Sequence, residues 1–242
     1  SPALAKALLR VRNPLPAAGG QDPELPEQVR QYAPQAFRVQ ERAVTDEDYA
    51  RVAQLYPGVQ RAVARQRWTG SWYTVYLAVD RRGGRSVAAD AAFKVALHAQ
   101  LARYRLAGHD LEIRDPVYVP LDIALQVCVT PDRYASDVQA ALLWRLGTGR
   151  LTGARAGQLA FFHPDNFSFG DALYLSALVQ AVQQVSGVAS VRIVTFQRWG
   201  RTAGGEIAAE VIAAAPLEVL RMDNDPNFPE NGRLRLDMLG GL

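Results

Sequence analysis

One segment of the chain carries an unusually clear order of start and stop signals. Thr45 and Asp48 form a Ser/Thr-x-x-Asp pattern, which is typical of the residues that cap the start of a helix. Apolar residues then recur at helical spacing until Pro57 and Gly58, which end the helix. A strand-like run follows directly at 59–68. The segment therefore predicts a capped helix, a glycine turn and a strand.

A second segment repeats this order. Ser168 and Asp171 stand where a second cap belongs, a helical run follows to Gly187, and a strand-like run comes next. Other runs predict strands and helices around these two segments. The predicted strands are 72–80, 109–116, 118–131 and 188–199, and the predicted helices are 88–106, 134–147 and 171–188. Two small units in tandem, each a sheet covered on one face by two helices, explain this repetition.

The predicted fold class is α+β, with two tandem small α/β-sandwich units of ferredoxin-like type. The predicted parts are an extended N-terminal arm at 1–45, units at 46–117 and 118–200, and a C-terminal strand with a docking loop at 201–242. The arm has a helical pattern at 2–10, a proline- and glycine-rich stretch at 13–28 and a short helical pattern at 27–32. Because the chain begins at Ser1 without Met, we expect it to be part of a longer polypeptide.

Composition excludes several classes of protein. The longest apolar runs are too short to cross a bilayer, and no signal-peptide pattern is visible. Cys128 is the only cysteine, so an internal disulfide and a cysteine-rich zinc site are excluded. Its place in an apolar run predicts a small buried side chain. A net charge of +3 over 242 residues does not by itself predict binding to nucleic acid.

The stretch 161–175, with the sequence FFHPDNFSFGDALYL, gathers residues that could perform chemistry. His163 and Asp165 could help to hold a metal ion, but no second histidine or cysteine stands at ligand spacing. The simpler interpretation is a tight turn, in which Pro164 fixes φ, Asp165 bonds locally and the phenylalanines are buried. A metal-dependent hydrolase centred on His163 stays open as a second alternative function.

The stretch 222–232, with the sequence MDNDPNFPENG, is rich in oxygen ligands and turn residues. Its spacing departs from that of a calcium-binding EF-hand loop, so a rigid docking loop is the favoured interpretation. The residues predicted to shape this loop are Asp223, Asp225, Pro226, Pro229, Asn231 and Gly232.

Arginines at 61, 65 and 67 share one face of the predicted strand 59–68, and aromatic residues follow at 68, 72 and 73. A basic sheet face with aromatic residues could bind RNA, which gives the first alternative function, a nucleic-acid-binding α+β module. The sequence contains no P-loop, no G-x-S-x-G and no G-x-G-x-x-G motif. We therefore predict no enzyme, no catalytic residues, no metal and no cofactor.

Several segments, taken in order, resemble one known family. They are NPLPAAGGQDPE, RAVTDEDYARVAQLYPGV, YVPLDIALQVCVTP, FFHPDNFSFGDALYLSALVQAVQQVSGV and LRMDNDPNFPENGRLRLDM. They are similar to the C-terminal part of baseplate assembly proteins, the baseplate J-like, wedge-forming family of contractile phage tails and phage-tail-like contractile injection systems. The resemblance spans nearly the whole chain.

The resemblance implies a structural component of the baseplate wedge, which forms a ring around the hub and couples baseplate change to sheath contraction. It implies partners among other baseplate proteins: a paralogous wedge subunit, the hub, sheath-initiator-like proteins, and sheath and tube proteins. It also implies a homo- or hetero-oligomer in a six-fold assembly, without nucleic acid or a membrane span. The expected location is a phage-tail-like particle assembled in the cytoplasm. The motifs at 161–171 and 222–232 then become docking and turn elements.

Overall fold

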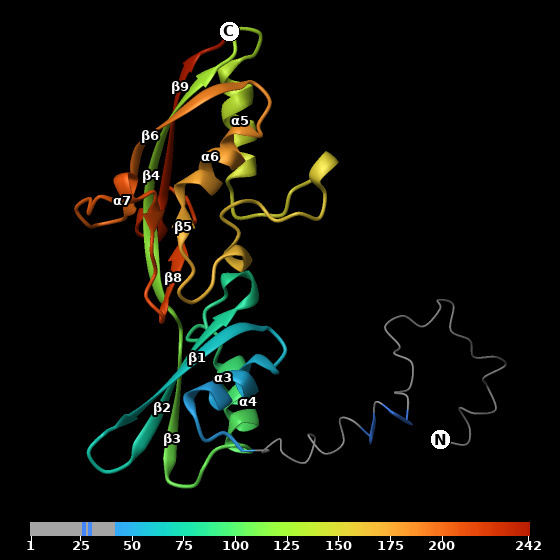
Figure 1. Cartoon of the computed structure of the whole chain (residues 1–242), viewed down its shortest axis with the longest axis vertical. Helices are drawn as coiled ribbons and strands as arrows, with labels where there is room; N and C mark the ends of the chain where they lie inside the picture. The colour runs from blue at the N-terminus through green and yellow to red at the C-terminus, as the bar shows by residue number, and fades with distance from the viewer. Residues whose placement is uncertain (1–25, 28, 31–41) are drawn as a thin grey trace, which may run out of the picture. The chain divides into compact units, whose positions relative to one another are not determined.

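The structure of the chain is a computed structural model that describes residues 26–27, 29–30 and 42–242. The helical pattern at 2–10, most of the stretch at 13–28 and half of the stretch at 27–32 lie outside the described residues. Residues 42–242 form one compact body (Figure 1). Within the described part of the chain, no helix has the length and apolar character that a membrane crossing requires.

The first half of this body is a three-stranded sheet with two helices on one face (Figure 1). Its elements are α3 (Asp46–Gln54), β1 (Val59–Trp68), β2 (Tyr73–Arg81), the 3₁₀ turn η1 (Arg82–Gly84), α4 (Ala91–Ala102) and β3 (His109–Arg114). The strand order is β1-β2-β3, in which β1 and β2 are antiparallel and β2 and β3 are parallel. Helix α4 makes the crossover between the two parallel strands.

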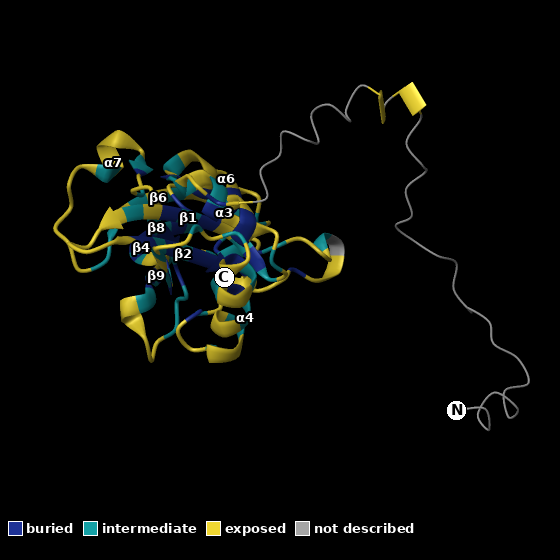
Figure 2. Cartoon of the chain, turned by 90° about the horizontal axis from the view of Figure 1, so that it is seen from below, coloured by how far each residue is buried: buried dark blue, intermediate teal, exposed yellow. Residues whose placement is uncertain are grey.

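Alternation along β2 builds the core of this half. Val75, Leu77 and Val79 are fully buried, and every second residue points to the same face of a strand. Tyr49 of α3 and Leu97 of α4 belong to the same buried cluster, so the two helices cover that face. Figure 2 shows the buried residues gathered along the strands and a largely exposed outer surface of α4. We call this cluster the first core.

The second half is organised around one long central strand, β4 (Val117–Val129). The other elements are α5 (Ala135–Arg145), η2 (Gly153–Arg155), η3 (Pro164–Asn166), β5 (Leu173–Tyr174), α6 (Leu175–Gln183), β6 (Val188–Arg198), α7 (Glu206–Ala209), β7 (Val211–Ile212), β8 (Glu218–Arg221), η4 (Pro229–Asn231) and β9 (Arg233–Gly240). Strand β6 pairs with β4 antiparallel, and β8 and β9 pair with β4 in parallel. Helices α5 and α6 lie on one face of the sheet (Figure 1).

A separate buried cluster fills this second half. Leu121, Ile123 and Leu125 of β4 are at most 1% exposed, and Leu142 of α5 and Leu178 of α6 are fully buried in the same cluster. We call this cluster the second core. The boundaries predicted at 46–117, 118–200 and 201–242 stay predictions. The second core also contains residues from 201–242, among them Ile212, Leu220 and Leu234.

Strands β8 and β9 act as one strand that a loop interrupts. Pro120 pairs with Arg221, an offset of 101 residues, and Asp122 pairs with Arg233, an offset of 111 residues. The loop at 222–232 therefore adds ten residues between neighbouring positions of the sheet without disturbing the parallel pairing on either side. The stretch predicted to be a docking loop thus leaves and re-enters the sheet at one place.

The predicted α+β class is confirmed by these mixed sheets and their helices. The ferredoxin-like detail is not confirmed: in a ferredoxin-like split β-α-β unit another strand lies between the two parallel strands, whereas β2 and β3 are direct neighbours.

The prediction that Ser168 and Asp171 cap a helix is wrong. Helix α6 begins at Leu175, and its N-cap residue is Tyr174, which makes no side-chain capping bond. The chain before it is extended because Leu173 and Tyr174 pair with β7. The Ser168 N–H instead donates to the Asp171 carboxylate at 2.8 Å, which closes a turn.

Both predicted glycine turns are present. Gly58 follows α3 and has φ +91°, and Gly187 follows α6 and has φ +93°. Only glycine adopts this region readily, so each glycine lets the chain turn directly from a helix into a strand. Thr45 and Asp48 form the predicted capping box at the start of α3.

Candidate functional site

The stretch from Phe161 to Asp171 lies where the two cores meet. Its local structure is a tight turn, η3, in which Pro164 occupies the first position. The Asn166 amide donates to the carbonyls of Ala160 and Phe161, at 2.8 and 3.1 Å. These bonds fix the turn, as the sequence predicts.

His163 is buried inside this turn and has a structural role there. Its Nδ1 accepts a hydrogen bond from the Asp165 N–H at 3.1 Å. Phe162, Phe167 and Phe169 are buried in the second core, while Phe161 is half-buried. The described residues bring together no group of three or more histidine, cysteine, aspartate or glutamate side chains that could hold a metal ion. His163 is therefore placed to shape the turn.

Asp165 does more than the predicted local bonding. Its carboxylate accepts a hydrogen bond from the Gly83 N–H in η1, and its carbonyl accepts one from the Gln60 side chain at 3.0 Å. The site where a Gly84 Cβ would stand is 3.0 Å from the Pro164 ring. The turn at 163–166 is thus bonded to and packed against the end of the first sheet.

Asp80, at the end of β2, forms the second link between the two halves. It is 3% exposed, and its carboxylate accepts a hydrogen bond from the Ser168 hydroxyl at 3.3 Å. Burial raises the pKa of this carboxyl to about 7, and the nearby charges of Asp165 and Asp171 add to the rise. The Ser168 bond acts in the opposite direction. No pattern in the sequence points to Asp80, because its partners lie more than eighty residues away.

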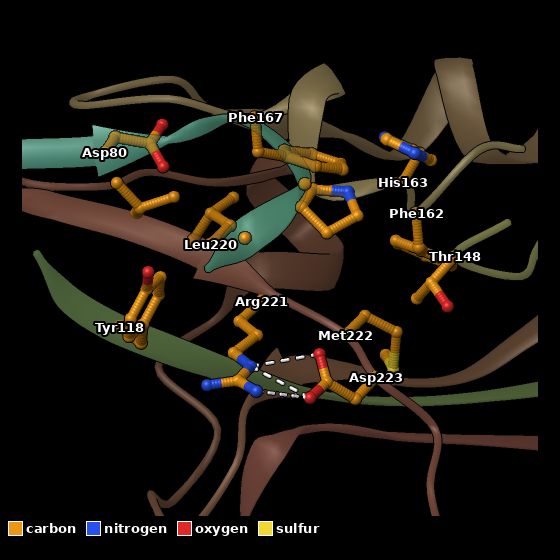
Figure 3. Close-up of a pocket in the computed structure, with 14 residues that line it drawn as sticks. Asp80, Tyr118, Thr148, Phe162, His163, Phe167, Leu220, Arg221, Met222 and Asp223 are labelled. Atoms are coloured by element: carbon orange, nitrogen blue, oxygen red, sulfur yellow. Dashed lines mark hydrogen bonds and ion pairs between the residues drawn. The ribbon is translucent and has the colours of Figure 1, made fainter. Parts of the chain in front are cut away.

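A pocket of about 280 Å³ lies beside Asp80 and the turn at 163–166. Its walls come from both halves: Asp80 and Gly84 from the first, Tyr118 from β4, His163 from the turn, and Arg221 from β8. Figure 3 shows the Tyr118 hydroxyl pointing into the pocket toward the side on which Asp80 lies. This hydroxyl is buried and has no hydrogen-bond partner among the described residues. Burial raises the pKa of Tyr118 to about 12, so its hydroxyl is protonated at neutral pH.

Arg221 closes the opposite wall of the pocket (Figure 3). Its guanidinium group lies over the Tyr118 ring, 5.1 Å from the ring centre, and donates three hydrogen bonds to Asp223. The side-chain bond to Asp223 raises the pKa of Arg221 further. The arginine thus supports the tyrosine ring while its charge is taken up by its own neighbour.

The loop at 222–232 is held by its own side chains. The Asn224 side-chain oxygen accepts from the Leu234 N–H at 2.9 Å, and the Asp225 carboxylate accepts from the Asn227 N–H at 2.9 Å. A Cβ on Gly232 would lie 2.7 Å from the Arg221 carbonyl, so only glycine fits there. Side-chain oxygens of three residues that could have served calcium, Asp223, Asn224 and Asp225, accept hydrogen bonds from the protein. Docking by this loop stays a prediction.

The arginines of β1 share one exposed face, as predicted, but two of them lie near carboxylates. Arg65 lies 3.7 Å from Asp46, and Arg61 lies 4.0 Å from Asp171. Arg67 lies over the Tyr76 ring, 6.0 Å from its centre. This face is therefore partly neutralised within the chain, which weakens the nucleic-acid alternative.

The sheet and helices of the first core carry a known family signature. Residues 41–114 match the family model of the Baseplate J-like central domain. This segment is similar to a baseplate J-like central domain. The match covers 74 of the 242 residues and coincides with the half of the structure built from α3 to β3. The resemblance to baseplate J-like proteins is thereby confirmed. The bonds of Asp165 to Gly83 and of Ser168 to Asp80, which we call the junction, join the matched segment to the second core.

One solved structure is similar to a larger part of the chain. It is a chain of the anti-feeding prophage (AFP) baseplate, determined by cryo-electron microscopy with six-fold symmetry, at 16% sequence identity and a TM-score of 0.44. The alignment covers 93% of this chain and 44% of that chain, so this chain spans less than half of the protein it matches. A search of the curated proteins found no match.

Proposed function

We propose that this chain is a structural component of a baseplate wedge in a contractile phage tail or phage-tail-like injection system. The observation that carries the proposal is the baseplate J-like central domain at residues 41–114. In this role the protein forms part of a ring around the hub and couples baseplate change to contraction of the sheath. It performs no catalysis.

The exposed surface of the central domain supports a role in assembly. Trp68, Trp72 and Tyr73 surround the turn between β1 and β2, and their exposed fractions are 58%, 51% and 47%. Large exposed aromatic side chains are uncommon on monomeric proteins and are enriched at the centres of protein interfaces. The β1–β2 turn is therefore the first surface at which we place a neighbouring subunit.

The junction supports the same role because it fixes the central domain to the second core. The links of Asp165 to Gly83 and of Ser168 to Asp80 join parts of the chain that are far apart in sequence. A subunit that transmits a change of baseplate geometry needs such a firm internal connection. The neighbours that we propose are a paralogous wedge subunit, the hub, and sheath and tube proteins, within a particle assembled in the cytoplasm.

The test is affinity purification of the tagged protein from its native host, followed by negative-stain electron microscopy and mass spectrometry. We expect sheathed, tube-bearing particles with the tag at one end, together with baseplate peptides. A matched sample carries Trp68→Ala and Trp72→Ala, which should reduce recovery of the particles while leaving the protein folded. Recovery of the wild-type chain alone, or with RNA in place of other subunits, would contradict the proposal.

A further inference from the structure

The junction pocket holds hydrogen-bond acceptors that the chain itself leaves unused. Asp80 is almost fully buried, yet among the described residues only Ser168 bonds to its carboxylate, through one oxygen at 3.3 Å. The buried Tyr118 hydroxyl has no partner within the same described part of the chain. Buried polar groups are normally paired, and those without a protein partner commonly serve a ligand or an ordered water.

The cationic and imidazole groups that line the pocket are already engaged. Arg221 donates to Asp223, and the Nδ1 of His163 accepts from the Asp165 backbone. Asp165 and Asp171 add negative charge beside Asp80. Among the described residues, the one cationic side chain in the pocket wall is Arg221, and its charge is paired with Asp223, so Asp80 and the Tyr118 hydroxyl have no charged donor of their own.

From this geometry we propose that the junction pocket binds one guanidinium or primary ammonium group. Such a group would donate to the free oxygen of Asp80 and to the Tyr118 hydroxyl oxygen, while the Tyr118 ring and Phe167 line the apolar part of the pocket. The pocket of about 280 Å³ has room for the end of an arginine or lysine side chain or for a small amine. The inference goes beyond the baseplate role and stands without it.

Occupation would stabilise the junction, because the pocket is built from both halves. A cation favours the ionised form of Asp80, whose pKa is raised to about 7 by burial, so binding should strengthen from pH 6 to pH 8. The charged or titratable groups that face Asp80 from the surrounding elements are Arg61, its cross-strand neighbour in β1, and Asp165, Asp171, Tyr118, His163, Arg221 and Asp223.

The experiment is an NMR titration of the full ¹⁵N-labelled chain with methylguanidinium chloride at constant ionic strength. Methylurea, which has the same shape and no charge, serves as the matched control ligand. We expect saturable shifts at the amides of Asp80, Gly84 and Tyr118 with methylguanidinium, and none with methylurea. Equal shifts with both ligands, or shifts that do not saturate, would overturn the proposal.

Three variants test which groups bind the cation. Asp80→Asn keeps the shape of the side chain and should weaken binding about tenfold or more, because it removes the buried charge. Tyr118→Phe should weaken binding about threefold, because it removes one hydrogen bond. Asp132→Asn, on an exposed side chain that does not line the pocket, should leave binding unchanged. Unchanged affinity in Asp80→Asn, with the variant folded, would also overturn the proposal.

A second experiment uses putrescine and purified assemblies. It decides whether the bound cationic group belongs to a free amine or to a side chain of a neighbouring subunit. Putrescine that binds far more tightly than methylguanidinium, together with normal assembly of Asp80→Asn, identifies a free amine as the ligand. Weak binding of both small ligands, together with loss of assembly in Asp80→Asn, identifies a basic side chain of a neighbouring subunit. Both results presuppose the saturable, Asp80-dependent binding of methylguanidinium described above. That binding is measured on the isolated chain, so it does not depend on the baseplate role.

Discussion

The segments from Thr45 to Trp68 and from Ser168 to Arg198 start with the same pattern and use it differently. The Thr45 hydroxyl accepts from the Asp48 N–H at 3.2 Å, and the Asp48 carboxylate accepts from the Thr45 N–H at 3.0 Å, so both bonds stay within the start of α3. The Ser168 hydroxyl instead donates to Asp80 at the end of β2. One local pattern thus caps a helix in the first segment and joins the two halves of the molecule in the second.

The difference comes from the residues that follow each pattern. Asp48 is followed directly by helical chain, whereas Leu173 and Tyr174 pair with Ile212 and Val211 before α6 begins. The extended chain leaves no helix N-terminus for the Ser168 hydroxyl to serve. A capping pattern therefore predicts which local bonds are available, and a distant strand decides whether they form.

The largest expected effect concerns the pH dependence of stability. The carboxyl of Asp80 has a pKa of about 7 in the folded protein and 3.8 in its ordinary state. Between pH 4 and 7 the unfolded chain loses this proton first, so the free energy of unfolding should fall as pH rises, by about 4 kcal/mol at most. Urea unfolding at pH 5 and pH 8 measures about 3 kcal/mol of this change, because the unfolded chain has already lost the proton at pH 5.

Asp80→Asn is the control for that prediction, because the amide does not titrate. The difference in unfolding free energy between the variant and the wild type should shift in favour of the variant from pH 5 to pH 8. A constant difference would mean that Asp80 ionises normally. The bond from Ser168 to Asp80 would then involve an ordinary ionised carboxylate, as the exposed capping bonds at Thr45 do.

A smaller effect separates the two glycine turns. Gly187→Ala should lower the free energy of unfolding by about 3 kcal/mol, because φ is positive and the new Cβ would lie 2.7 Å from Val138. Gly58→Ala has the same strain but only an ordinary contact of 3.6 Å with Phe93, so about 1 kcal/mol is expected. Chemical denaturation of both variants gives the comparison, and equal losses would show that the crowding at Gly187 relaxes freely.

Loss of the hydrogen bond between the Asp165 carboxylate and the Gly83 N–H should have an intermediate effect on the free energy of unfolding. Asp165→Ala removes the acceptor of the Gly83 N–H and should cost about 2 kcal/mol, with faster hydrogen exchange at Gly83. Asp225→Ala is the matched control, because among the described residues the Asp225 side chain bonds to Asn227 alone and is part of an outer loop. Equal protection of Gly83 in the wild type and in Asp165→Ala would show that this bond does not hold the junction.

The smallest effect tests the opening comparison directly. Thr45→Ala should cost about 1 kcal/mol and speed exchange in the first turn of α3. Ser168→Ala should leave exchange in α6 unchanged, since Tyr174 is the N-cap of that helix. Faster exchange at the start of α6 in Ser168→Ala would restore the cap that the sequence pattern predicts.

Much of the fold is predictable because its signals are local. The capping box at Thr45, the turns at Gly58 and Gly187, and the alternating strands each depend on residues within one element. Two features were not predictable: the bond from Ser168 to Asp80, and the buried Tyr118 hydroxyl, which has no partner among the described residues. Both arise only when strands distant in sequence come together. A buried carboxylate at the end of a strand has no sequence signature of its own. The turn at His163 was predicted, but its bonds to Gln60 and Gly83 were not.

Strands β8 and β9 pair with β4 as one interrupted strand, so the pairing of the sheet does not depend on the length of the loop between them. Because pairing with β4 resumes after Gly232 where it paused at Arg221, chain can be added or removed between these points without moving any strand. The loop can therefore change in length and sequence while the strands that flank it keep their positions. Variation within 225–231 could remodel an outer surface there while Met222 keeps its buried place in the second core, and an engineer could insert a tag at the same position.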